Sequence, residues 1–528
     1  MFLQRIGNRG IRLGTLFERA ASRHPTNLLV LDHDLDIAPE TGRRMTVAEA
    51  ADLVDDFASR LWAAGLRPGR RIVIHKSDGF DIMLLACAAS RIGAVPVLLS
   101  PRLDGETVAA LLERAERPYL LTDAAKLDKD LPEAVFSLTS KVLLARGSHP
   151  DATSLRSLTG VPRVPAVTSP PEHPALITHT SGTTGLPKLA VHTGRTLQAR
   201  YRPQAAVIAP VIRGRETIAI HVSFVHSRLI TALSISLLRG FPILVLAHSE
   251  PAHVAALFAE LRPGIIEAHP NSFMRWEELA DDPRGPLADV KLFSSTFDAI
   301  HPRTVRRLLA ASRRRNPLFG QLYGQSEVGP AVVRSFSPRR PQDADGRCVG
   351  MAFPGMTRVR VVSRNGRPPS KDNPGYIEVQ SDGRIITYLG EQERYDKQED
   401  NGWWRMGDVG YRTRWGCVHL LDREVDMIES VGSTLAIEDA LFSRLEQLAE
   451  IVVVRDQNGN AVPVVSTRDD LPLDRDAWAA AVRDLPAMAD PVQRSLRDLP
   501  QTATTKIKRL ELARQLDAEA APPAPGAS

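Results

Sequence analysis

Cysteine is scarce in this sequence, and long uninterrupted apolar runs are missing. The 528 residues include three cysteines, Cys87, Cys348 and Cys417, which are far apart and in no metal-ligand spacing. This pattern argues against a disulfide framework or a zinc site and predicts that the protein is located in the reducing cytoplasm. The first ten residues contain no apolar stretch typical of a signal peptide. The most apolar stretch, residues 229–247, is interrupted by an Arg-Gly pair and a proline, so we interpret it as a buried helix and a buried strand and expect no membrane span.

A large excess of charge of either sign is also missing. The 67 Lys and Arg residues nearly balance the 62 Asp and Glu residues, which leaves a formal net charge of +5. The Arg-rich run at residues 306–307 lies in a helical pattern with Leu308 and Leu309, which is typical of a solvated helix face, so we expect no nucleic-acid partner. The length and the 43% hydrophobic content indicate a globular protein of at least two domains.

Helical segments alternate with short β-branched runs in the first part of the chain. Residues 47–64 and 78–92 have helical periodicity, and each segment is followed by an apolar run, at residues 71–74 and 95–99. The alternation resumes after residue 181. It predicts an α/β fold with doubly wound, helix-covered sheets.

The texture changes in the last third. Short strands alternate with Gly-rich turns between residues 358 and 421, which predicts a small, mostly antiparallel β subdomain. A compact α+β segment follows, so we place a domain boundary between an N-terminal domain, residues 1–422, and a C-terminal domain, residues 423–528. The Ala- and Pro-rich end, from about residue 516, is predicted to be a disordered tail.

One loop combines glycines, hydroxyls and a lysine in an order suited to phosphate. The backbone amides freed by its glycines and its four hydroxyls can surround phosphate oxygens, while the lysine adds a mobile positive charge. It is not a Walker loop, which needs Lys directly after the second Gly. A plain surface loop is the alternative, but nine residues in this order favour a triphosphate site: Thr180, Ser181, Gly182, Thr183, Thr184, Gly185, Leu186, Pro187 and Lys188.

This loop resembles the phosphate motif T-S-G-T-T-G-x-P-K-G of the ANL superfamily of adenylate-forming enzymes, with Leu189 in place of the last Gly. The superfamily includes acyl- and aryl-CoA synthetases, peptide-synthetase adenylation domains and luciferases. The resemblance extends from the first helix to Lys506. It implies a large N-terminal domain that binds ATP and the acid, and a small mobile α+β C-terminal domain that acts as a lid.

The segment at residues 323–327 is similar to the superfamily's Y-G-x-T-E motif. An aromatic face, Tyr323, can stack on adenine beside Gly324, and the hydroxyl of Ser326 can reach the α-phosphate. The carboxylate of Glu327 can hold the Mg²⁺ that neutralises the phosphates. In a G-W-x-x-T-G-D-like segment, Asp408 is expected to accept hydrogen bonds from the ribose hydroxyls.

The C-terminal motifs bear on the lid. The resemblance implies that Arg423 contacts ribose or phosphate, and that Val425, where relatives usually have Asp or Lys, is the hinge. Lys506 falls at the position of the adenylation lysine, which bridges the attacking carboxylate and the α-phosphate. A nearby lysine, Lys508, is the alternative for this role.

The expected acid pocket departs from the superfamily pattern. His226 is expected to border the acid site, or else to be a core histidine, and Arg228 to bind a polar substrate group or to point outward toward a carboxylate. Phe297 replaces a glycine and should fill part of the groove. Asp298 is expected either to accept from the adenine amino group or to cap the next helix. A small or aromatic acid is therefore favoured over a long fatty acid.

The leading hypothesis is an AMP-forming acid–CoA ligase that uses ATP, Mg²⁺ and CoA. The alternatives keep the adenylation step but change the acceptor: a biosynthetic enzyme that activates nitrite to diazotise an aromatic amine, or one that loads an acid onto a carrier protein. A non-catalytic nucleotide sensor is the remaining hypothesis. Catalytic roles are assigned to Lys188, His226, Glu327 and Lys506.

Overall fold

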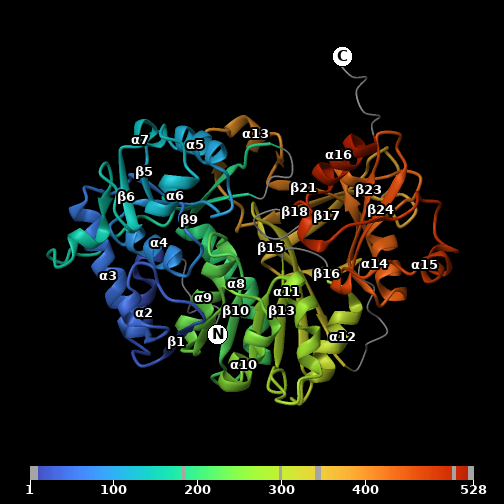
Figure 1. Cartoon of the computed structure of the whole chain (residues 1–528), viewed down its shortest axis with the longest axis horizontal. Coiled ribbons are helices and arrows are strands. Elements are labelled where there is room, and N and C mark those ends of the chain that lie inside the picture. Colours follow the sequence, from blue (N-terminus) through green and yellow to red (C-terminus); the bar gives the residue numbers. More distant parts are fainter. Residues whose placement is uncertain (1–9, 181–184, 297–299, 339–346, 502–506, 521–528) are drawn as a thin grey trace.

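The computed structural model describes residues 10–180, 185–296, 300–338, 347–501 and 507–520. Within these residues the strands form sheets of fourteen, eight and three strands. The two large sheets lie side by side, and the C-terminal part of the chain packs at one end of the molecule (Figure 1). None of the described helices is long and apolar enough to cross a membrane.

The largest sheet is parallel in its middle and antiparallel at both ends. Its order is β2 (Arg44–Thr46), β1 (Leu28–Leu31), β11 (Ile243–Val245), β10 (Ile218–His221), β12 (Ile265–Ala268), β13 (Leu292–Ser295), β14 (Leu318–Gln325), β15 (Gly329–Phe336), β16 (Cys348–Ala352), β22 (Val418–Arg423), β21 (Trp403–Arg412), β18 (Gly375–Ser381) and β17 (Thr357–Val362), with β20 (Glu399–Asp400) paired to β21.

The second sheet is mainly parallel, and its last two pairings, β8–β9 and β9–β19, are antiparallel. Its order is β7 (Thr153–Ser154), β6 (Lys141–Arg146), β5 (Tyr119–Asp123), β3 (Arg71–Ile74), β4 (Val95–Leu98), β8 (Pro174–His179), β9 (Leu189–Thr193) and β19 (Thr387–Tyr388).

Alternate residues of the parallel strands face different cores, because successive side chains of a strand point to opposite sides. On β1, Leu29 and Leu31 belong to a core shared with the second sheet, whereas Val30 belongs to a core on the far side. The shared core is filled by α2 (Leu16–Ala21), α3 (Val47–Ala63), α4 (Asp81–Arg91), α8 (Gly194–Val211) and α9 (Ser227–Arg239). The outer faces are covered by α10 (Pro251–Leu261), α11 (Pro270–Arg275) and α12 (Pro302–Ala311), and by α5 (Gly105–Arg114), α6 (Ala124–Lys129) and α7 (Val135–Leu138).

Helices on both faces of the parallel parts of the two large sheets make the fold the α/β class that the sequence predicts. The apolar stretch at residues 229–247 forms most of α9 followed by β11, both buried, as expected. The strands at residues 357–423 are antiparallel, also as expected. They do not form a separate sheet, since β22 pairs with β16 and thereby continues the largest sheet.

The C-terminal part has its own small sheet and two small cores. The sheet comprises β23 (Leu448–Arg455), β24 (Ala461–Thr467) and β25 (Val492–Gln493), and the helices are α14 (Thr434–Arg444), α15 (Arg475–Val482) and α16 (Arg509–Ala520). Residues 516–520, assigned to a disordered tail, are helical because Leu512 and Leu516 of α16 pack on this sheet. The domain boundary at 422/423 and the mobility of the lid stay predictions.

Candidate active site

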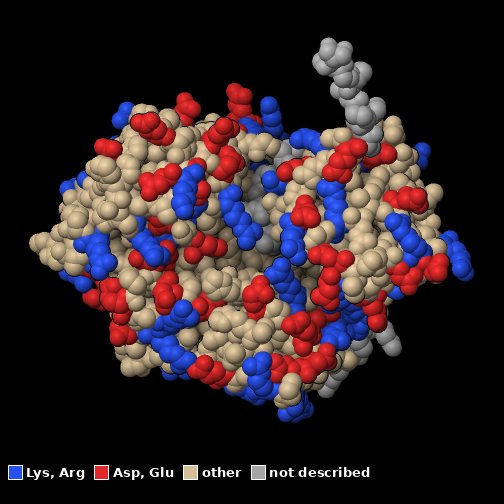
Figure 2. Space-filling view, in the orientation of Figure 1, with Lys and Arg blue, Asp and Glu red and all other residues tan. Residues whose placement is uncertain are grey.

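The main cavity has a volume of about 490 Å³ and opens between the N-terminal sheets and the C-terminal part. Its wall includes residues at the carboxyl ends of β8 and β14, where ligands of open α/β sheets usually bind. The wall also includes Glu438 and Arg509 from the C-terminal helices. Lys and Arg side chains lie along the edge of a hollow near the middle of the molecule, as Figure 2 shows.

Lys188, Glu327 and Tyr388 form a compact polar cluster in this cavity. The Lys188 Nζ donates to Glu327 Oε1 at 3.0 Å and to the Tyr388 hydroxyl at 2.7 Å, and that hydroxyl donates to the same Glu327 oxygen at 2.6 Å. Burial alone would raise the pKa of Glu327, but the charge of Lys188 and the Tyr388 hydrogen bond outweigh it and lower that pKa. Burial and the neighbouring carboxylate raise the pKa of Tyr388, so its phenol is a donor.

Tyr388 was not assigned to the site by sequence analysis, and the sheet topology explains its place. Strand β19 pairs with β9, and Tyr388 lies opposite Ala190 in this ladder. Since Lys188 directly precedes β9, the pairing brings the phenol beside the ammonium although 200 residues separate them.

Thr180 lies at the start of the expected phosphate loop. Its backbone N–H donates to the carbonyl of Lys188 at 2.9 Å, which closes the base of the loop. Its buried Oγ1 has no hydrogen-bond partner among the described residues. Gly185 has φ +86° with open space where a Cβ would stand. Of the expected phosphate ligands, Ser181, Gly182, Thr183 and Thr184 lie outside the described residues.

The expected nucleoside side is built around Asp408. The Tyr323 hydroxyl donates to Asp408 Oδ2 at 2.6 Å, and Arg423 Nε lies 3.7 Å from Asp408 Oδ1. The structure thus brings together three residues that the motifs assigned to adenine and ribose. Gly324 serves close strand packing, because a Cβ there would lie 2.0 Å from the Gly329 carbonyl oxygen.

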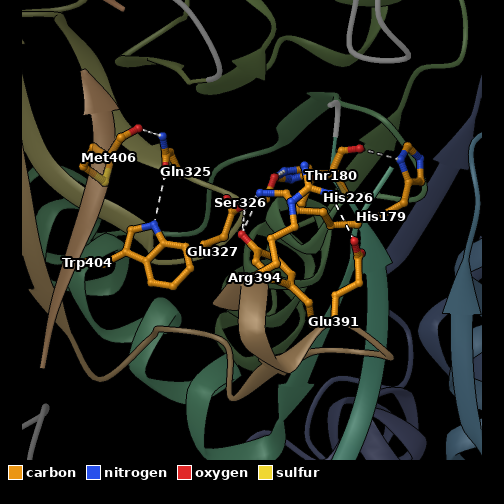
Figure 3. A network of polar contacts seen from close by, with 12 residues as sticks. His179, Thr180, His226, Gln325, Ser326, Glu327, Glu391, Arg394, Trp404 and Met406 are labelled. Carbon is orange, nitrogen blue, oxygen red and sulfur yellow. Dashed lines mark hydrogen bonds and ion pairs between the residues drawn. The ribbon is translucent and has the colours of Figure 1, made fainter. Parts of the chain in front are cut away.

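Neighbouring contacts fix the strand that carries these residues. The Gln325 amide accepts from Trp404 Nε1 at 3.3 Å and donates to the carbonyl of Met406 (Figure 3). Arg200, which sequence analysis missed, donates to the carbonyl oxygens of Ser326 at 2.8 Å and Glu327 at 2.9 Å. Burial lowers the pKa of Arg200 to about 9.

His226 belongs to the cavity and not to the closed core. Its Nδ1 accepts from the backbone N–H of Arg228 at 3.0 Å, and its Nε2 lies 3.3 Å from Ser326 Oγ. With Nδ1 as acceptor, the ring proton is on Nε2, which donates to the serine. Figure 3 shows His226 near Ser326.

Arg228 pairs with a carboxylate, as one of the two alternatives expected, and its binding of a substrate group stays a prediction. It pairs with a carboxylate, that of Glu267, through Nε and through Nη2 at 2.5 Å, but it does so inside the protein and in the cavity wall. Arg228 is 7% exposed and Glu267 3%. Phe297, Asp298 and Lys506 lie outside the described residues, and α12 begins at Pro302 with His301 at the N-cap position.

The residues present fit Mg²⁺ in one respect. The buried carboxylate of Glu327 lies in the cavity wall, and its Oε1 accepts from Lys188 and Tyr388. Among the described residues no group of three or more His, Cys, Asp or Glu side chains could hold a metal. Mg²⁺ commonly uses one or two carboxylates together with substrate phosphates, so a single carboxylate suffices beside ATP.

The family match places the protein among the adenylate-forming enzymes of the ANL superfamily. The chain belongs to the AMP-binding enzyme family, whose sequence pattern matches residues 17–389. It is 47% identical over 528 residues to a 3-amino-2-hydroxy-4-methoxybenzoate diazotase from Streptomyces cremeus, covering 96% of this chain and 95% of that protein.

More distant relatives include a second diazotase and a CoA ligase. A 3-aminoavenalumate diazotase from Streptomyces sp is 25% identical, covering 88% of this chain and 87% of that protein. A 4-chlorobenzoate–CoA ligase from Arthrobacter sp is also 25% identical, over 82% of this chain and 81% of that protein. The crystal structure of the anthranilate CoA ligase AuaEII with anthranoyl-AMP has a TM-score of 0.82 at 18% identity, over 98% of this chain and 99% of that chain, and shows the shared fold.

Proposed function

We propose that this adenylate-forming enzyme is an ATP-dependent diazotase, which activates nitrite and transfers its nitroso group to an aromatic amine. One observation carries the proposal: the 47% identity to a diazotase extends over 96% of the chain. The sequence patterns ranked a CoA ligase first and a diazotase as an alternative. The similarity reverses this order.

The chemistry balances without an external oxidant. A nitrite oxygen attacks the α-phosphorus of ATP, an O–P bond forms, and pyrophosphate leaves. The amine nitrogen then attacks the nitroso nitrogen; the N–N bond forms as the N–O bond to AMP breaks, and the amine loses a proton. Protonation and loss of water convert the N-nitrosamine into the diazonium ion.

The residues of the cavity suit the first step. Lys188 and the Thr180 hydroxyl would hold phosphate oxygens, with Gly185 in the same loop, and Glu327 would ligate Mg²⁺, which supplies charge neutralisation at the phosphates. Asp408 and Arg423 would hold the ribose. His226 and Ser326 border the space where nitrite would approach the α-phosphate.

An AMP-forming acid–CoA ligase is the second candidate. It is favoured by the similarity to the 4-chlorobenzoate–CoA ligase, which covers 82% of the chain. Both candidates share the adenylation step and differ in the anion and the acceptor. Transfer to a carrier protein is a further form of the same candidate.

Pyrophosphate release with ATP and Mg²⁺ separates the candidates. The purified enzyme is assayed with nitrite, with aryl acids and with fatty acids, each with and without CoA, and diazonium formation is trapped by azo coupling to a naphthol. We expect nitrite-dependent pyrophosphate release and an azo dye when an aminophenol-type amine is present, with no CoA requirement. CoA-dependent turnover of an aryl acid, with no response to nitrite, would replace the diazotase by the ligase.

A further inference from the structure

Two buried polar side chains in the cavity wall have hydrogen-bonding atoms without partners. The Nη1 of Arg228 and both amide atoms of Gln204 have no hydrogen-bond partner among the described residues. The two side chains are 7% and 3% exposed and both line the cavity. A buried polar group without a partner is costly, so such groups in a cavity wall indicate a ligand that completes them.

The Arg228 guanidinium is held in one orientation by its surroundings. Glu267 on β12 accepts from Nε and Nη2, and Ser294 on β13 accepts from Nη2 at 3.3 Å. A bidentate pair of this kind fixes the plane of the guanidinium. Arg228 lines the cavity and Glu267 is not among its described lining residues, so the arginine is the member of the pair that borders a ligand.

Gln204 stands on the neighbouring helix. It lies on α8 one turn after Arg200, whose guanidinium donates to three backbone carbonyls and to the Ser227 hydroxyl. A carboxamide offers a donor and an acceptor but no charge. The wall therefore offers an anion-binding group and a neutral polar group, which together match an aromatic ring with a carboxylate and a second polar substituent.

We propose that Arg228 is a specificity-determining residue that binds the carboxylate of an aminobenzoate-class acceptor through Nη1, with Gln204 contacting a neutral polar substituent of the ring. This inference rests on the proposed diazotase function. Nitrite shares the planar oxyanion chemistry, but a charged hydrogen bond to nitrite would stabilise the ground state of the nucleophile and slow its attack. The acceptor carboxylate takes no part in the bond changes, so a charged hydrogen bond to it strengthens acceptor binding without slowing the reaction.

The test compares isosteric acceptors on the wild-type enzyme. The kcat/KM is measured for 3-amino-2-hydroxybenzoate and for 3-amino-2-hydroxybenzamide, at saturating ATP and nitrite. Charge-assisted hydrogen bonds predict a preference of about 10- to 100-fold for the carboxylate. Equal kcat/KM values for the two acceptors would overturn the proposal, and this comparison needs no variant to fold.

Variants then assign the preference to Arg228. The double variant Arg228→Met/Glu267→Gln avoids an unpaired buried charge. We expect it to treat both acceptors alike, to bind 3-amino-2-hydroxybenzoate more weakly in calorimetry with AMP present, and to keep the KM for nitrite. Arg306→Met, on the exposed face of α12, is the matched control and should leave the preference intact.

Two outcomes have separate meanings. A raised KM for nitrite with an unchanged acceptor preference would show that Arg228 serves nitrite, and would overturn the assignment. Failure of the proposed function is visible earlier, since the wild-type enzyme would then release no pyrophosphate in response to nitrite. The acceptor comparison is made only on an enzyme that passes this first assay.

Discussion

Removing the hydroxyl of Tyr388 tests whether the Lys188–Glu327 cluster supports catalysis. In Tyr388→Phe the carboxylate of Glu327 loses the 2.6 Å hydrogen bond from the phenol but keeps the ammonium at 3.0 Å. Under the proposed function Lys188 would turn to the phosphates when ATP binds, and the phenol would then be the remaining side-chain donor described for this carboxylate. Tyr388 is therefore expected to position Glu327 for Mg²⁺ most strongly when substrate is present.

The magnitude follows from the kind of contact. A hydrogen bond to a charged group contributes about 1.5–3 kcal/mol, and each 1.4 kcal/mol corresponds to about tenfold in rate. We therefore expect kcat/KM for ATP to fall by about 10- to 100-fold in pyrophosphate release. The Tyr388 hydrogen bond also lowers the pKa of Glu327, so the acid limb of the pH–rate profile should move to higher pH in the variant.

Tyr395→Phe is the matched control for this substitution. Tyr395 packs against Tyr388 at a ring distance of 5.9 Å and donates its hydroxyl to the carbonyl of Ile385 at 3.0 Å, away from Glu327. Both variants keep the aromatic packing, so their midpoints of thermal unfolding should be similar. An unchanged kcat/KM in Tyr388→Phe, or an equal loss in Tyr395→Phe, would refute the role given to the phenol.

Three further substitutions are informative. Thr180→Val removes a buried hydroxyl without a described partner, so it should stabilise the free enzyme by about 1 kcal/mol in thermal unfolding while raising the KM for ATP. A stabilised variant whose KM for ATP is unchanged would contradict a phosphate-binding role. Tyr323→Phe keeps the ring but removes the hydroxyl that orients Asp408, so calorimetry should show ATP binding about tenfold weaker; unchanged affinity would count against Asp408 as a ribose ligand. Burial raises the pKa of Asp422 to about 7, and its carboxyl accepts from the backbone of Thr434. The unfolded carboxyl titrates near its usual pKa, so below about pH 7 the folded state holds a proton that the unfolded state has lost. The free energy of unfolding should therefore fall by about 1.4 kcal/mol from pH 6 to pH 8. This part of the fall should vanish in Asp422→Asn and persist in the exposed control Asp372→Asn.

Local patterns predicted the elements of the α/β core well. The predicted helix at residues 47–64 is α3, Val47–Ala63, and the predicted strand at residues 71–74 is β3. At the start of α3 the side chain of Thr46 accepts from the backbone N–H of Glu49, whose own carboxylate accepts from the N–H of Thr46. Such signals depend only on residues close together in the chain, so a single sequence is enough to recognise them.

Partners across the sheets could not be predicted from local patterns. The pairing of β22 with β16, which joins the antiparallel strands to the largest sheet, depends on which strand edges meet in space. The same holds for β19 and β9, and hence for Tyr388 beside Lys188. Arg228 is an example. Its charge predicted a substrate group or a carboxylate as its partner, but only the structure identifies that carboxylate as Glu267 on β12.

The charges at the phosphate end of the cavity are balanced in the free protein. Lys188 is neutralised by Glu327, which is 7% exposed. Under the proposed function, binding of ATP and Mg²⁺ would separate this pair, with the ammonium moving to phosphate and the carboxylate to the metal. Separating a buried pair is costly unless each charge finds a new partner at once. Tyr388 touches both groups and Arg200 holds the backbone of Glu327, so the carboxylate keeps its place while the ammonium changes partner. Under the proposed function, the cluster would exchange one set of ionic partners for another with little rearrangement of the chain. We therefore expect it to bind the nucleotide more tightly together with Mg²⁺ than without it.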